Sequence, residues 1–253
     1  MECVSGAERP ERIARTSSGE IMVQLNRRDL LKGAAVATAA SLTSVAGAGT
    51  ASAAARPTLQ MGSHGTAVLA LQRRLASLGY WLGGADGQFG DLTRQSVVAI
   101  QKVAGQSRDG VCGPATWSRV DTGVRPHARS ARGHTVEINK TTQTLLVVDS
   151  GVVTRIYNTS TGSNQRYLQG GTWHVAVTPS GTFKVFRHVN AWDNGPLGKL
   201  YRPEYFNRGI AVHGYPSVPS TPASHGCARV SLPAMDNLWG PAGMQVGTPV
   251  LVY

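Results

Sequence analysis

The sequence predicts a multidomain protein in which a small all-α bundle of three helices precedes a mainly-β domain. Three observations predict this arrangement: residues 57–122 carry apolar side chains at helical spacing, residues 123–134 show no periodicity, and strand-like segments begin at Thr135. The 253 residues, 41% of them hydrophobic, are enough for two packed domains. Three cysteines are too few for a disulfide scaffold.

Positive charge is the main compositional bias. The chain has 25 Lys and Arg against 14 Asp and Glu, a formal net charge of +11. Nucleic acid, an anionic surface and an acidic polymer are the partners that such a charge can favour. The sequence has no run of large apolar residues long enough for a polytopic membrane protein.

Residues 1–53 are predicted to be a leader. A basic segment, a mildly apolar Ala-rich stretch and a small-residue cleavage site follow one another: Asn26-Arg27-Arg28-Asp29-Leu30-Leu31-Lys32, then 33–40, then Ala51-Ser52-Ala53. The paired arginines resemble a twin-arginine export signal, and a start at Met22 would give that signal an ordinary length. We therefore expect export to the cell wall or extracellular space, with no stable membrane span after signal cleavage. Residues 54–253 keep 19 basic and 9 acidic side chains. Export argues against nucleic acid as a partner.

Residues 57–122 have the rhythm of a helical bundle. The first helix has one apolar stripe and ends at Gly79, the second is expected to be capped by Asp91, and the third to begin at Pro114. The stripes are Val68, Leu71, Leu75 and Leu78, then Val97, Ile100 and Ala104. In this bundle we expect Cys112 to be a buried thiol.

The sequence of this segment resembles the peptidoglycan-binding domain of wall enzymes. The matching runs are Met61-Gly62-Ser63-His64-Gly65, Leu71-Gln72, Leu78-Gly79-Tyr80, Asp86-Gly87-Gln88-Phe89-Gly90 and Asp109 to Trp117. The resemblance spans the whole module and implies that residues 57–122 bind peptidoglycan.

The remaining chain is divided into a basic linker and a β domain. Residues 123–134 carry three arginines and no acidic residue, which is typical of a linker, and residues 135–253 form the second domain. Strands are predicted on both sides of the turn Asp149-Ser150-Gly151 and at three later segments, with one short helix. These elements are Thr144–Val148, Val152–Tyr157, Thr182–His188, Ile210–Val212 and Pro249–Tyr253, and a helix over Pro233–Leu238.

Reactive residue types gather between His213 and Arg229. A Cys nucleophile needs a nearby base, because the thiolate is the reactive form, and the base must be oriented through its other ring nitrogen. Cys227 with His213 and His225 could instead hold zinc and a water molecule. A structural Cys beside incidental histidines is the third interpretation, and spacing alone does not separate the three. Gly226, directly before Cys227, permits close approach of a substrate backbone.

The same window resembles the L,D-transpeptidase family of cysteine enzymes. Ser224-His225-Gly226-Cys227 matches the signature, and other pieces follow in the family's order: Ser160-Thr161-Gly162, Thr178 to Phe183, Gly209 to Gly214 and Val246 to Val250. The resemblance covers essentially all of residues 135–253. It departs from many members in the short, Pro-rich connection of 14 positions between His213 and Cys227.

The resemblance implies a role for each residue of the window. Cys227 would be the nucleophile, His213 the base, and the carbonyl of Gly214 the group that orients the imidazole. His225 and the amides of Gly226 and Cys227 would line the oxyanion site. Arg229 would face the peptide or carboxylate end of the donor, and Ser224 would shape the turn.

The expected function is therefore that of an exported L,D-transpeptidase that forms 3→3 cross-links. A stem tetrapeptide is the expected donor, an amine of a neighbouring stem the acceptor, and acidic wall polymers are additional anionic partners; no cofactor or metal is expected. Three alternatives stay open: an L,D-carboxypeptidase that uses the same acyl-enzyme, a zinc hydrolase, and a non-catalytic wall-binding protein.

Overall fold

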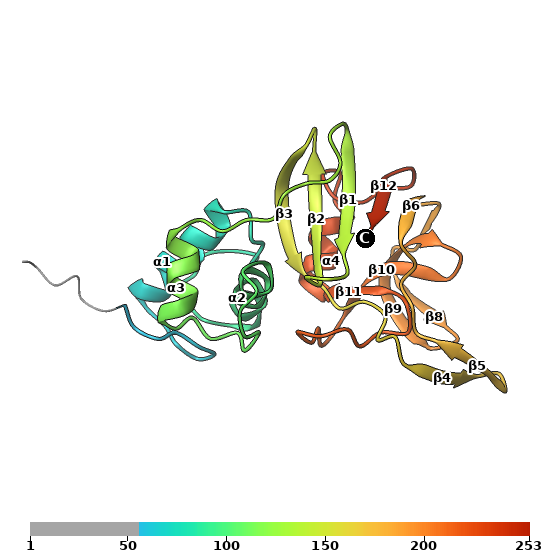
Figure 1. Cartoon of the computed structure of the whole chain (residues 1–253), viewed down its shortest axis with the longest axis horizontal. Helices are drawn as coiled ribbons and strands as arrows, with labels where there is room; N and C mark the ends of the chain where they lie inside the picture. Colours follow the sequence, from blue (N-terminus) through green and yellow to red (C-terminus); the bar gives the residue numbers. More distant parts are fainter. Residues whose placement is uncertain (1–55) are drawn as a thin grey trace, which may run out of the picture. The chain divides into compact units, whose positions relative to one another are not determined.

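The computed structural model describes residues 56–253 (Figure 1). The leader predicted for residues 1–53, with the alternative start at Met22, lies outside these described residues. Within 56–253, no helix has both the length and the apolar character needed to cross a membrane.

Three helices form the first part of the described chain, as the sequence predicts. They are α1 (Thr66–Ser77), α2 (Asp91–Val103) and α3 (Pro114–Asp121). The predicted apolar stripe is buried, with Leu78 as the C-cap of α1, and Gly79 follows in the left-handed region at φ 84°, where glycine is favoured. Pro114 begins α3 as expected. The capping prediction for Asp91 is wrong: Gly90 is the N-cap, and Asp91 lies in the first turn, where its charge still favours the helix dipole. Cys112 is a buried free thiol, as expected.

The second part contains two sheets and a separate hairpin. The first sheet has the order β3-β2-β1-β12-β6, with β1 parallel to β12 and its other pairs antiparallel. Its strands are β1 (His134–Asn139), β2 (Thr144–Asp149), β3 (Val152–Asn158), β6 (Gly181–Lys184) and β12 (Pro249–Val252).

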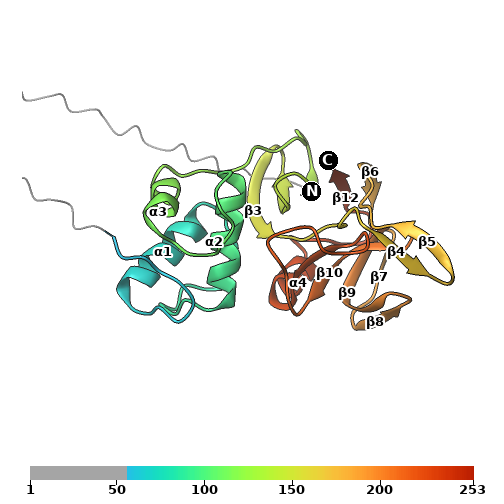
Figure 2. The ribbon, with the colours of Figure 1, turned by 60° about the horizontal axis from the view of Figure 1, so that its bottom comes forward.

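The second sheet has the order β11-β10-β9-β7, with β8 also paired to β9. Its strands are β7 (Arg187–His188), β8 (Trp192–Gly195), β9 (Gly198–Asn207), β10 (Ile210–Tyr215) and β11 (Ala228–Ser231). The hairpin of β4 (Arg166–Gln169) and β5 (Thr172–Val175) extends from one end of this domain in both ribbon views (Figure 2).

The predicted β-hairpin and short helix are confirmed. β2 and β3 pair antiparallel across a turn in which Ser150 and Gly151 have positive φ angles. The short helix is α4 (Leu232–Trp239), capped by the Ser231 hydroxyl.

The single strand predicted over Thr182–His188 is wrong. The segment is β6 and β7, because the chain changes sheets between them. The amide of Val185 donates to Thr248 beside the first sheet, and the amide of Phe186 donates to Tyr205 in the second. No local pattern reveals such a change of partner.

Strand β2 of the first sheet is buried on both faces. Leu145 and Val147 of β2 face a core shared with α4 and the second sheet, whereas Leu146 and Val148 belong to the core of the three helices. Residues 123–133, within the predicted linker, contain no helix or strand. This arrangement leaves the outer face of the second sheet available for a site.

Candidate active site

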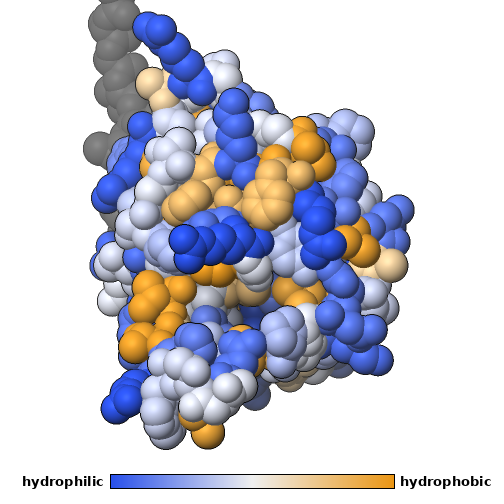
Figure 3. Space-filling view, turned by 90° about the vertical axis from the view of Figure 1, so that its right-hand side faces the viewer, coloured by the Kyte–Doolittle hydropathy of each residue, from blue (hydrophilic) through white to orange (hydrophobic). Residues whose placement is uncertain are grey.

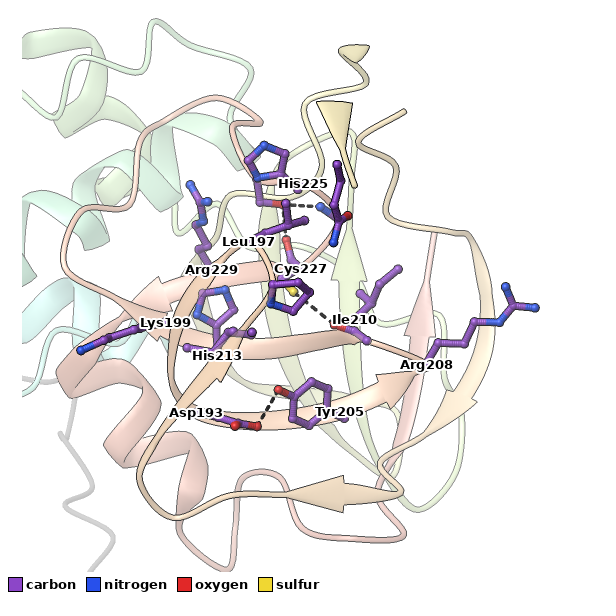
Figure 4. A pocket seen from close by; sticks show the side chains of 18 of the residues that line it. Asp193, Leu197, Lys199, Tyr205, Arg208, Ile210, His213, His225, Cys227 and Arg229 are labelled. Carbon is purple, nitrogen blue, oxygen red and sulfur yellow. Dashed lines mark hydrogen bonds between the residues drawn. The ribbon is translucent and has the colours of Figure 1, made fainter. Parts of the chain in front are cut away.

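A pocket of about 760 Å³ opens on the second sheet. It is lined by the β4–β5 hairpin, the β8–β9 turn, β10 and the residues just before and within β11 (Figure 4). Six of the seven residues singled out in the sequence line it: His213, Ser224, His225, Gly226, Cys227 and Arg229. The seventh, Gly214, contributes its backbone next to the pocket.

Parallel pairing of β10 with β11 brings His213 and Cys227 together. His213 pairs with Arg229, and Val212 pairs with Ala228. Val212 and Ala228 are buried in the core. Because successive side chains of a strand point to opposite faces, His213, Arg229 and the preceding Cys227 all face the pocket. Figure 4 shows the three side chains near one another in its centre.

His213 is held as a neutral imidazole with one free nitrogen. Its Nδ1 donates to the carbonyl of Gly214 at 2.9 Å, which leaves Nε2 as an acceptor. Burial lowers the pKa of His213 to about 4; the Gly214 bond opposes this shift, and the charge of Arg229 adds to it. The neutral ring can therefore accept a proton at ordinary pH.

Cys227 is a half-buried thiol immediately before β11. Burial raises its pKa, although a hydrogen bond from the Ala211 amide and the charge of Arg229 act in the opposite direction. Its Sγ lies 3.9 Å from the carbonyl oxygen of Gly209. The resting pair is thus a neutral thiol beside a neutral imidazole.

Ser224 braces the turn that presents Cys227. Its hydroxyl accepts from the amide of Gly226 at 3.0 Å and donates to the carbonyl of Cys227 at 2.5 Å. Gly226 has φ 148°, and a Cβ there would lie 3.0 Å from the carbonyl oxygen of Val177. The turn therefore requires glycine at position 226.

Gly214 must also lack a side chain. A Cβ at this position would lie 2.7 Å from the ring of Tyr201 and 3.1 Å from both Leu232 and Met235. This close approach lets α4 pack against β10 and fixes the carbonyl that holds His213.

Arg229 and His225 line the pocket beside Cys227 and His213. The Arg229 guanidinium lies 4.2 Å from the centre of the Tyr215 ring and donates through Nη1 to the carbonyl of Ala223 at 3.2 Å. Its buried Nε has no hydrogen-bond partner among the described residues. The His225 ring packs edge-on against Tyr167, with 4.6 Å between ring centres.

Sequence reasoning missed both hairpins that border the pocket. Tyr167 and His174 come from β4–β5, and Leu197 and Lys199 from the β8–β9 segment. Gly170-Gly171, both with positive φ, is a two-residue hairpin signal that could have located β4–β5. The side chains themselves carry no catalytic pattern in the sequence.

Most exposed large apolar side chains of the described residues lie between positions 168 and 197. On this side of the molecule, where β4, β5 and β6 lie, apolar and hydrophilic side chains are interspersed (Figure 3). The exposed apolar side chains between positions 168 and 197 are Leu168, Trp173, Val175, Val177, Phe186, Trp192 and Leu197. Basic side chains also reach the pocket: Arg187, Lys199, Arg208 and Arg229. Its Asp193 is paired with Arg187 at 2.8 Å.

A zinc site at Cys227 would require three suitable side chains to converge. Within residues 56–253, no group of three or more His, Cys, Asp or Glu side chains is arranged to hold a metal ion.

Three family models match the chain. The putative peptidoglycan binding domain matches residues 64–120, the L,D-transpeptidase catalytic domain residues 133–252, and the twin-arginine translocation pathway signal sequence residues 24–44. All three resemblances noted in the sequence are thereby confirmed. In chain order they are an export signal, a peptidoglycan-binding region and an L,D-transpeptidase domain.

A solved structure supports the assignment along most of the described chain. The L,D-transpeptidase from Xylanimonas cellulosilytica DSM 15894 is 48% identical, with a TM-score of 0.75, and the match covers 77% of this chain and 97% of that chain. This chain belongs to the L,D-transpeptidase family.

Curated relatives match over shorter stretches. The N-acetylmuramoyl-L-alanine amidase CwlL from Bacillus licheniformis is 48% identical over 60 residues, 23% of this chain and 17% of the relative. The zinc D-Ala-D-Ala carboxypeptidase from Streptomyces albus G is 45% identical over 67 residues, 25% of this chain and 26% of the relative. The chain thus spans only a minor part of the length of these relatives.

Proposed function

We propose that this chain forms 3→3 cross-links between peptidoglycan stems through an acyl-enzyme on Cys227. The observation that carries the proposal is the placement of Cys227 and His213 on one face of two paired strands, with the His213 Nδ1 bound to Gly214. A base held through one ring nitrogen, with the other free beside a thiol, is the arrangement that nucleophilic catalysis needs.

In the acylation step, Nε2 of His213 accepts the Cys227 proton as Sγ attacks the carbonyl carbon at the L-centre of the third stem residue. The tetrahedral intermediate collapses with cleavage of the peptide bond to the terminal D-Ala. His213 returns the proton to the leaving amine, and a thioester remains on Cys227. Because both groups start uncharged, proton transfer accompanies the attack rather than preceding it.

In the second step, an amine of a neighbouring stem attacks the thioester. His213 takes a proton from that amine, the new amide bond forms, and the Cys227 sulfur leaves and regains its proton. Two half-reactions that share one covalent intermediate make this a ping-pong mechanism.

The surrounding residues give the substrate its orientation. The amide of Cys227 and the ring of His225 are assigned to the developing oxyanion. The amide of Gly226 is engaged by the Ser224 hydroxyl, so its role is to hold the turn in shape. Arg229, a pocket cation without a carboxylate partner among residues 56–253, is assigned to a stem carboxylate.

The positive charge of the exported chain suits the same setting. Residues 54–253 carry a net charge of +10 by their side chains. We assign this charge to attraction toward carboxylate-bearing stems and acidic wall polymers, which retain the protein near its substrate.

The test is to incubate the protein with a disaccharide-tetrapeptide and analyse the products by mass spectrometry. We expect a cross-linked dimer that has lost one D-Ala, unchanged by a chelator, and a loss of at least about a thousand-fold in turnover for Cys227→Ala. Tripeptide alone would indicate the L,D-carboxypeptidase, in which water resolves the thioester.

Three outcomes would contradict the proposed mechanism. Loss of activity with a chelator, restored by zinc, would favour the zinc hydrolase. Unchanged turnover by Cys227→Ala would remove the nucleophile assignment. A wild-type protein that binds peptidoglycan but leaves the stem intact would be a non-catalytic wall-binding protein.

A further inference from the structure

The three-helix module is joined to the catalytic domain through a continuous interface. Ile156 of β3 is fully buried in the core of the helices. Its backbone accepts from the amide of Trp81 at 3.0 Å and donates to the carbonyl of Gly79 at 2.8 Å. A merely tethered wall-binding module would not need such contacts.

Lys102 of α2 is the central polar contact of this interface. The residue is 2% exposed, and its ammonium donates to the carbonyls of Gln143 and Thr159 at 3.0 and 2.9 Å and to the side chain of Asn158. All three acceptors belong to the catalytic domain. A buried ammonium is tolerated only when its N–H groups are hydrogen-bonded. These bonds therefore fix the positions of Gln143, Asn158 and Thr159 relative to α2.

Hydrogen bonds continue from Gln143 to the turn before Cys227. The side chain of Gln143 makes two hydrogen bonds to Thr161, at 2.7 and 2.8 Å. The carbonyl of Thr161 accepts from the amides of Ala223 and Ser224, both at 3.0 Å. Ser224 in turn braces Cys227.

Thr159 and Ser160 also hold the backbone of Arg229. The hydroxyl of Thr159 donates to the carbonyl of Arg229 at 2.8 Å, and the backbones of Ser160 and Arg229 exchange two hydrogen bonds. Thr159 is therefore the single residue between Lys102 and the backbone of Arg229 in this path of hydrogen bonds.

A second set of contacts reaches the short connection between His213 and Cys227. Arg108 of the module donates to the carbonyl of Ser220 at 3.2 Å, and Gln95 of α2 donates to the carbonyl of Val218 at 3.4 Å. Val218 itself is 3% exposed. The module thus holds the connection from one side while residues 158–161 hold its end.

We propose that the peptidoglycan-binding module has a second function, in which Lys102 and Arg108 act as positioning residues for the catalytic turn. This inference rests on the proposed function where turnover is measured. The contacts also predict how fast Cys227 itself reacts, which does not depend on that function. Removal of either side chain loosens the turn and misplaces the nucleophile relative to His213.

The test compares Lys102→Met and Arg108→Met with two controls, Lys184→Met at an exposed position of β6 and Arg132→Met at an exposed position of the predicted linker. Three quantities are measured: kcat and KM with the tetrapeptide, the rate of Cys227 alkylation by iodoacetamide, and sedimentation with purified peptidoglycan. Thermal unfolding verifies that each variant is folded.

For the two interface variants we expect kcat to fall about ten-fold or more, because small misplacements of reacting groups are costly. KM and peptidoglycan binding should stay near wild type, and alkylation should become faster as the turn opens. Arg108→Lys should recover most of the loss, since an ammonium can also donate to Ser220. The controls should behave as wild type.

Folded interface variants with wild-type kcat and wild-type alkylation would overturn the proposal. If Lys102→Met does not fold, the half-buried Arg108 variant decides alone. If the wild type leaves the tetrapeptide intact, the proposed function fails, and the alkylation rates still decide whether the module positions Cys227.

Discussion

The two residues proposed to react, His213 and Cys227, combine burial with very few polar contacts. His213 is 4% exposed and has one hydrogen bond to a backbone carbonyl, while Cys227 has only weak partners among the described residues. Burial disfavours both charged forms, so it lowers the pKa of His213 and raises that of Cys227. The pair is therefore uncharged at neutral pH before substrate binds.

The titration of His213 gives a prediction for the pH dependence of turnover. Protonation removes the base, so kcat/KM should decline only as pH falls through the folded pKa of about 4. At about pH 5.5, where an ordinary histidine is mostly protonated, most activity should remain. Arg229 faces the ring and opposes its protonation.

The measurement is a kcat/KM profile from acidic to neutral pH, with circular dichroism to confirm folding at each point. His213→Gln should abolish turnover, because the midpoint of the kcat/KM profile is assigned to the titration of His213. An acidic midpoint at or above about 6.5, the value of an unperturbed histidine, would contradict the buried neutral base.

At the scale of elements, the turn from Ser224 to Cys227 depends on backbone shape. Gly226 occupies a conformation that side chains rarely adopt, and its carbonyl accepts from the Thr178 hydroxyl at 2.6 Å. Both features fix the start of β11, and with it the direction of Cys227.

We expect Gly226→Ala to cost about 1–3 kcal/mol of folding free energy, because the backbone is strained and the methyl group meets the Val177 carbonyl. Turnover should fall further than stability alone explains, since the turn moves with Cys227. Urea unfolding and steady-state kinetics measure the two effects.

Gly84→Ala is the matched control. Gly84 lies in a loop of the module. Its own φ is not in the positive region that side chains rarely adopt, and an added Cβ would have no atom within 4 Å. Equal behaviour of the two variants would show that the strain at Gly226 has no functional consequence.

At the scale of the whole molecule, one sheet belongs to two cores. Alternate residues of β2 face the helices on one side and α4 on the other, so neither core is complete without this sheet. The described residues 56–253 accordingly lie within one compact unit.

The shared sheet predicts a single cooperative unfolding transition for the module and the catalytic domain. Ile156→Ala should lower the stability of both together by about 2–5 kcal/mol, as expected for a fully buried isoleucine. Scanning calorimetry, with tryptophan fluorescence and alkylation of Cys227 as local probes, follows the transition.

Val152→Ala is the control on the same strand, because Val152 is 59% exposed and should change stability by no more than about 0.5 kcal/mol. Two separated transitions, only one of them shifted by Ile156→Ala, would show that the domains unfold independently.

Local patterns alone predicted a large part of this architecture. Apolar spacing located α1 and α2, a proline located the start of α3, and a turn sequence located the β2–β3 hairpin, because these features depend on residues close together in the chain. The Ser224-His225-Gly226-Cys227 run and His213 were apparent for the same reason.

Tertiary structure decided what depends on distant partners. The sequence could not show that β6 and β7 belong to different sheets, or that His174 and Lys199 reach the pocket, because strand pairing is set by the whole core. Nor could it show that Lys102 holds residues 143 and 159, since a lysine on a helix is usually solvated. The sequence determined the family and predicted which groups react, and long-range packing determined how those side chains are held.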